Sequence, residues 1–86
     1  MIDLINTLLT YNCKLTMYDF QQEEPVIFCL AIYIDDPKDI WHIANLCRDH
    51  KLDMGYAPQY DEMFKFLYFP KLILDKKSYD HLSAKA

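Results

Sequence analysis

A chain of 86 residues with a formal net charge of −4 is long enough for one domain only, and its acidic balance argues against direct nucleic-acid binding, which requires a basic contact face. An apolar content of 52%, with 15% aromatic residues and a single glycine, excludes a disordered or low-complexity chain. The longest unbroken apolar run, over 26–34, is of strand length and falls well short of the ~20 residues that a membrane span requires.

The first third of the chain predicts a helix followed by a strand. Apolar residues at helical spacing favour a helix over 1–11, with Ile2, Ile5, Leu8 and Leu9 on its packed side. Alternation of apolar and polar residues then indicates a half-buried strand over 13–20, with Tyr18 on the polar side.

A β-hairpin is the expected next unit. The polar segment 21–25 ends in a proline, which donates no ladder hydrogen bond, and therefore indicates a turn. The β-branched and aromatic run 26–34 has no polar interruption, which is typical of a central strand covered on both faces.

The clearest local pattern begins a helix over 37–51. The carboxylate of Asp36 can accept hydrogen bonds from free backbone N–H groups, and Pro37 suits the first helical position because it lacks an N–H. Asp39 adds negative charge near the positive end of the helix dipole. We expect Ile40, Ile43, Ala44 and Cys47 to form the apolar side of this helix.

The last third of the chain predicts two strands and a short helix. Gly55 and Pro58 suggest only an irregular edge strand over 53–57, followed by a loop through Asp61 and Glu62. The aromatic segment 63–69 is strongly β-prone. Pro70 ends or bends this strand, 72–74 can continue it, and Asp75 can cap a last helix that frays after Ser83.

The resulting order is α-β-β-α-β-β-α. We therefore predict one two-layer α+β domain over 1–86, with 84–86 frayed, in which helices cover one face of a four-stranded, mostly antiparallel sheet.

Catalytic patterns are weak throughout the chain. His42, Cys47 and His50 share a predicted helix, but His42 and Cys47 lie about 140° apart around its axis, so these side chains do not converge on one ion. One glycine cannot build a glycine-rich phosphate loop, and no serine precedes Ser78. We expect no enzyme, no cofactor and no metal, and we treat a metal- or thiol-dependent protein as the outside alternative.

The cysteines and the N-terminus indicate the cell compartment. Cys13, Cys29 and Cys47 are an odd number at wide spacings, unlike the dense even sets of small secreted scaffolds, so all three are expected to be reduced. The first residues lack the basic and apolar regions of a signal peptide. Both observations favour a cytoplasmic protein.

Two groups of residues are candidates for partner binding. The acidic group could steer a basic partner, although solvated turns are the simpler explanation of such residues. It comprises Glu23, Glu24, Asp35, Asp36 and Asp39. The aromatic group could anchor that partner; it comprises Tyr18, Trp41, Phe64 and Tyr68.

The aromatic residues also allow a structural interpretation. If 63–69 is a strand, Phe64, Phe66 and Tyr68 share one face, which is either an exposed interface or a core under the last helix; both remain open. Trp41 lies about 100° from Ile40, which favours the edge of the core over an exposed anchor.

These patterns lead to a first functional hypothesis. The protein is expected to bind and inhibit, or dock onto, a protein with a basic surface, without membrane or direct nucleic-acid contact. Small acidic phage inhibitors of host nucleic-acid-handling or defence proteins are analogous in type, although no motif supports that analogy. The alternative is a homo-oligomer, such as a homodimer, that pairs through its sheet.

Overall fold

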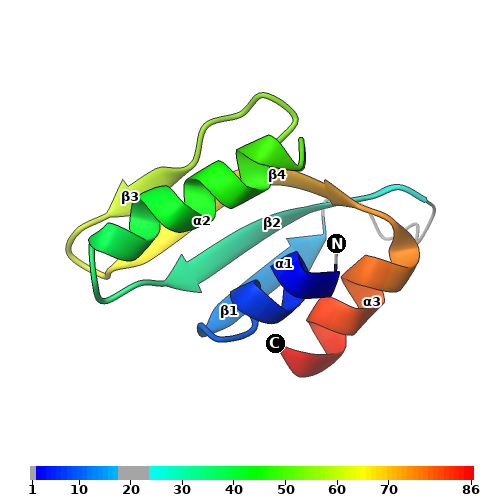
Figure 1. The fold of residues 1–86 in the computed structure, drawn as a ribbon, viewed down its shortest axis with the longest axis horizontal. Coiled ribbons are helices and arrows are strands. Elements are labelled where there is room, and N and C mark those ends of the chain that lie inside the picture. The colour runs from blue at the N-terminus through cyan, green and yellow to red at the C-terminus, as the bar shows by residue number, and fades with distance from the viewer. Residues whose placement is uncertain (1, 18–23) are drawn as a thin grey trace.

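The computed structural model describes residues 2–17 and 24–86, and their elements follow the expected order α-β-β-α-β-β-α (Figure 1). The elements are α1 (Ile2–Leu8), β1 (Cys13–Met17), β2 (Val26–Tyr33), α2 (Lys38–Asp49), β3 (Gln59–Asp61), β4 (Phe66–Leu74) and α3 (Lys76–Lys85). The strands form one antiparallel sheet in the order β1-β2-β4-β3. The α+β prediction is confirmed.

The three helices lie on one face of this sheet, here called the inner face (Figure 1). Strand β2 alternates strictly, and Phe28, Leu30 and Ile32 on its inner face are 0% exposed. They form one core with buried residues of β4 and of all three helices. The ring of Tyr79 from α3 meets Phe28 edge-on at 5.0 Å between centroids.

The outer face of the sheet carries no helix within the described ranges (Figure 1). Ile27, Cys29 and Ala31 of β2 are half-buried there, and Tyr33 is 39% exposed. The expectation that β2 is covered on both faces by other elements is therefore wrong for the part of the chain that the structure describes. A central strand can shield its outer side chains partly by its two neighbouring strands alone.

Strand β4 is longer and starts later than its aromatic pattern suggests. It begins at Phe66 rather than Met63 and continues through Pro70 to Leu74. Phe28 pairs with Leu72 and Leu30 with Phe69, so β4 carries one extra residue at this point. Such a bulge tolerates Pro70, because the strand ladder is interrupted there.

Three further boundaries differ from expectation. The edge strand is β3 rather than 53–57, because Met54 and Gly55 have φ of 52° and 81° and form a turn. Helix α1 ends at Leu8, and Ile2 is 64% exposed, so it does not belong to the packed side. Helix α3 continues to Lys85, past the expected end at Ser83.

Candidate functional site

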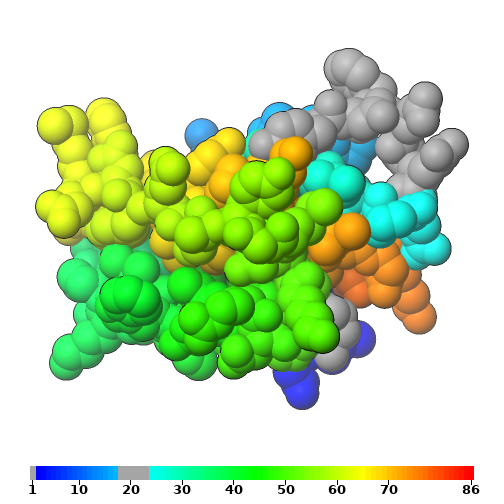
Figure 2. Space-filling model, turned by 90° about the horizontal axis from the view of Figure 1, so that it is seen from above, coloured from blue at the N-terminus to red at the C-terminus, as the bar shows by residue number. Residues whose placement is uncertain are grey.

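The sequence-predicted site residues gather mainly at one end of the domain. There β2 finishes, α2 begins and the β3–β4 hairpin turns, as Figures 1 and 2 both show. The backbone N–H of Ile34 donates to the carbonyl of Lys65 at 2.8 Å and ties the hairpin to the end of β2. We call this region the acidic–aromatic end; it consists of Tyr11, Tyr33, Asp35, Asp36, Asp39, Trp41 and residues 61–65.

Local capping chemistry fixes the start of α2. Oδ1 of Asp36 accepts from the backbone N–H of Lys38 at 3.0 Å, and Pro37 already has helical angles of φ −57° and ψ −21°. Asp36 thus bonds the backbone at the start of α2, as expected, but the N-cap position is Pro37 rather than Asp36, and the regular helix begins at Lys38. The same bond holds the carboxylate at the positive end of the helix dipole.

Next to this cap is a surface hollow lined by carboxylates and phenols. Its side chains include Tyr11, Tyr33, Asp35, Asp36 and Asp39. Partial burial, with the nearby carboxylates of Asp39 and Asp36, raises the pKa of Tyr11 above its ordinary value. The Tyr11 hydroxyl is protonated at neutral pH, as it would be at its ordinary pKa, and it lies near the carboxylate of Asp39.

The β3–β4 hairpin presents two large apolar side chains to solvent. Oδ1 of Asp61 accepts from the backbone N–H groups of Met63 at 2.9 Å and Phe64 at 3.1 Å, and Lys65 has a left-handed φ of 58°. An aspartate that bonds the backbone two residues ahead builds a turn. This turn leaves Met63 82% exposed and Phe64 64% exposed.

Trp41 has the bulkiest of the exposed side chains at this end, and 73% of its surface is exposed. The prediction that it belongs to the core edge is wrong. Helix α2 buries the side centred on Ile43 and Cys47, and Trp41 lies about 160° and 120° around the axis from these two residues. Trp41 instead borders a hollow between α2 and the segment 53–58.

The acidic–aromatic end carries more negative than positive charge. Segments 33–41 and 61–65 contain five carboxylates and two lysines, a formal charge of −3. Lys65 bonds Oδ1 of Asp35 at 2.7 Å, and this bond raises the pKa of Lys65. Because the pair is solvent-exposed, it contributes little to stability and leaves the overall field of this end negative.

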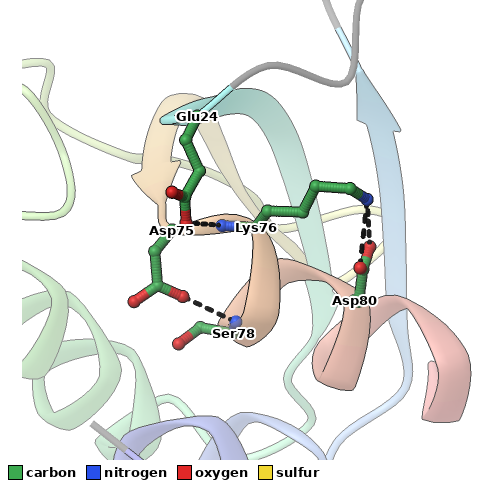
Figure 3. A network of polar contacts seen from close by, with 5 residues as sticks. All are labelled: Glu24, Asp75, Lys76, Ser78 and Asp80. Carbon is green, nitrogen blue, oxygen red and sulfur yellow. Dashed lines mark hydrogen bonds and ion pairs between the residues drawn. The ribbon is translucent and has the colours of Figure 1, made fainter.

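Glu24 lies at the opposite end of β2 and does not join this group. Its Oε1 accepts from the backbone N–H of Lys76 at 2.8 Å, beside the cap formed by Asp75 and Ser78 (Figure 3). Strand β2, which is roughly 23 Å long at the usual rise per residue, lies between Glu24 and Asp35. The predicted acidic rim is therefore not one continuous surface.

Tyr68 also lies apart, in the middle of the outer sheet face. It is 40% exposed and its hydroxyl donates to Sγ of Cys29 at 3.4 Å. Phe64 does not share that face as predicted, because it belongs to the hairpin turn. Tyr18 and Glu23 lie outside the described residues.

Sequence reasoning missed Met63, Tyr33 and Tyr11. Asp61 was available as a signal, because an aspartate two residues before an apolar pair can fold the pair into an exposed turn. Tyr33 lies in the unbroken apolar run 26–34, whose sequence does not distinguish the two faces of the strand. No sequence pattern placed Tyr11 beside Asp39.

The geometry gives little support to the alternative of a metal- or thiol-dependent protein. Within 2–17 and 24–86 no three residues among His, Cys, Asp and Glu are grouped closely enough to hold a metal ion. Nδ1 of His50 lies 3.0 Å from the carbonyl of Leu46 on its own helix. Burial raises the pKa of Cys47 to about 12 and that of Cys13 to about 11, which keeps both thiols protonated and poorly nucleophilic at neutral pH.

Comparison with known proteins gives no relative: no family model, curated protein or solved structure matches this chain. None of the helices in the described ranges is long and apolar enough to cross a membrane. Function must therefore be argued from the surface of the domain.

Proposed function

We propose that this protein is a non-enzymatic protein-binding domain that docks onto, or inhibits, a partner with a basic surface through the acidic–aromatic end. One observation carries the proposal: Trp41, Met63 and Phe64 are held out into solvent at 73%, 82% and 64% exposure, among an excess of carboxylates. Large apolar side chains gain stability from leaving water, so their fixed exposure at one end favours a partner that covers them.

The apolar side chains would provide most of the affinity. Aromatic anchors dominate many interfaces, and truncation of such an anchor typically weakens binding by about 2 kcal/mol or more. The Asp61 turn and the first turn of α2 hold Phe64 and Trp41 on ordered backbone. A fixed backbone reduces the conformational entropy that binding would otherwise cost.

The carboxylates would provide steering and selectivity. An excess of negative charge accelerates encounter with a basic surface and disfavours acidic partners. Protein surfaces that hold nucleic acid are basic, so an inhibitor of a nucleic-acid-handling or defence protein fits this chemistry. Asp36 also bonds the backbone at the start of α2, so charge removal has to be separated from loss of that bond.

Site-specific photocrosslinking in the native cells tests the proposal for a partner of any identity. A photoreactive phenylalanine analogue replaces Phe64 in one variant and Lys77, an exposed residue at the start of α3, in the control. We expect position 64 to capture a basic protein. We expect Lys77 to capture none of it, and Trp41→Ala to reduce the yield at position 64.

The salt dependence of the captured complex tests the electrostatic part. Affinity should fall as ionic strength rises, and Glu62→Lys should weaken binding more than Glu62→Gln does. Equal capture from positions 64 and 77, or binding that is insensitive both to salt and to the charge at Glu62, would contradict the proposal.

A further inference from the structure

We infer that the outer face of the sheet is a second binding surface, and that its occupant is another copy of this chain. Two domains would associate face to face, with β1 of one protomer above β3 of its partner. This face shares Tyr33 and Asp61 with the acidic–aromatic end but excludes Trp41, Met63 and Phe64, so the inference does not rest on the proposed function.

The two central strands carry mainly apolar side chains on the outer face, from the Tyr33–Phe66 pair at one end to the Ile27–Ile73 pair toward the other. Tyr33 and Phe66 lie side by side on neighbouring strands, with ring centroids 6.0 Å apart at an interplanar angle of 76°. Ala31 lies beside them, and Ile27 pairs with Ile73 farther along the same two strands. No helix of the described ranges packs on this face (Figure 1). A face of this composition gains from being covered.

The charges at the two edges of this face have opposite sign. One register row crosses the whole sheet through Lys14, Ala31, Tyr68 and Gln59. Lys14 is thus the outward residue of edge strand β1, and Asp61, two residues after Gln59, is an outward residue of edge strand β3. Lys71, the one lysine of β4, is at the bulge, with its ammonium 5.1 Å from the ring centroid of Tyr56.

This distribution is self-complementary under a two-fold axis parallel to the strands. Such an axis places β1 above the partner's β3 and leaves β2 and β4 in the middle, where the apolar side chains would meet. Lys14 would then lie above Gln59 in the partner, within reach of the carboxylate of Asp61, and the same pair would form twice. An axis perpendicular to the strands would place Lys14 near Lys14 and lose this pairing.

The size of the face predicts a weak dimer. Four strands about 4.8 Å apart and a central strand of roughly 23 Å give about 400 Å² for each partner. That area belongs to the class of transient interfaces rather than obligate ones. We therefore expect mainly monomer at low micromolar concentration and dimer at high micromolar concentration.

Sedimentation velocity across that concentration range tests the inference, with Gln59 as the probe. Gln59 is exposed on a short edge strand, so changing its charge perturbs the fold little. Gln59→Glu should strengthen association and Gln59→Lys should weaken it, each by about fivefold, because two symmetric pairs change together. Lys14→Glu should also weaken it, and the double variant Lys14→Glu with Gln59→Lys should restore it.

The control makes the same charge change on the helix side. Lys77→Glu in α3 should leave the association constant unchanged, and circular dichroism should confirm that all variants remain folded. A chain that stays monomeric at high micromolar concentration overturns the inference. So does a dimer that ignores the charge at position 59 or is not restored by the double variant. None of these variants alters Trp41 or Phe64, so failure here leaves the proposed function standing.

Discussion

Replacement of Phe28 by alanine should destabilise the domain far more than Tyr33→Ala on the same strand, because Phe28 is on the covered face of the sheet and Tyr33 is on the open face. Phe28 is 0% exposed on the inner face, and its ring packs edge-on against Tyr79 at 5.0 Å. Tyr33 is on the outer face and 39% exposed. Because both residues are aromatic and both lie in β2, their intrinsic strand propensities are closely matched, and the two variants differ mainly in how deeply the removed side chain is buried.

The expected magnitudes differ several-fold. Removing a buried phenylalanine side chain costs about 3–5 kcal/mol, which combines the lost transfer free energy with the cavity left behind. A domain of this length has a total unfolding free energy of roughly 4–13 kcal/mol, so Phe28→Ala should remove a large fraction of it. Tyr33→Ala should cost about 1 kcal/mol, because its ring remains partly in water and loses mainly its contact with Phe66.

Urea unfolding followed by circular dichroism measures both values. The slope of the unfolding free energy against urea concentration should be the same for both variants, so that differences in the unfolding midpoint report differences in stability. If Tyr33→Ala destabilised the domain as much as Phe28→Ala, the outer face would belong to a core, and the account of one open sheet face would be wrong.

Three further predictions concern titration, thiol reactivity and the exposed anchors. The hydrogen bond from the backbone N–H of Ser78 lowers the pKa of Asp75, so the stabilisation by this cap is present above the unfolded-state pKa and is lost as pH falls through the folded-state pKa. Asp75→Asn should therefore reduce the loss of unfolding free energy between neutral and acid pH, measured by urea titration. An unchanged pH dependence would argue against the cap. The raised pKa values of Cys13 and Cys47, about 11 and about 12, predict slow reaction with thiol reagents in the folded protein at neutral pH and fast reaction in urea; fast labelling of both in the native state would refute this. Trp41→Ala should change the unfolding free energy by no more than about 0.5 kcal/mol, because the side chain is exposed, and a loss of several kcal/mol would make it a core residue.

The sequence predicts best where a local pattern has one structural outcome. Asp36 and Pro37 specify the start of a helix through backbone chemistry that does not depend on the rest of the fold, and the structure has α2 there. Asp75 predicts the start of α3 for the same reason, with its Oδ1 accepting from Ser78 at 2.7 Å.

The sequence predicts less well where local and tertiary preferences compete. The aromatic residues of 63–69 favour a strand, but the Asp61 side chain bonds the backbone at Met63 and Phe64 and delays β4 to Phe66. Residues 26–34 are apolar at every position, so their sequence could not reveal that burial alternates along β2 and that the described helices cover one face only.

The candidate site depends on three-dimensional placement, which composition cannot supply. Asp35, Asp36, Asp39, Trp41 and Phe64 were singled out by residue type, and the topology places them together because β2, α2 and the β3–β4 hairpin meet at one end. The same topology separates Glu24, which is equally acidic but precedes β2 and bonds the backbone at Lys76.

Quenching of the fluorescence of Trp41, the single tryptophan of the chain, tests most directly whether an exposed aromatic anchor lies in an acidic field. Neutral acrylamide should quench the folded protein almost as strongly as the unfolded chain. When the quenching by each ion is divided by its quenching of a free tryptophan analogue, which corrects for the weaker intrinsic quenching by caesium, the ratio should be higher for caesium cations than for iodide anions at low ionic strength. Emission that is blue-shifted and shielded from acrylamide, or a preference for iodide, would contradict the proposal that this end of the domain presents an apolar anchor to a basic partner.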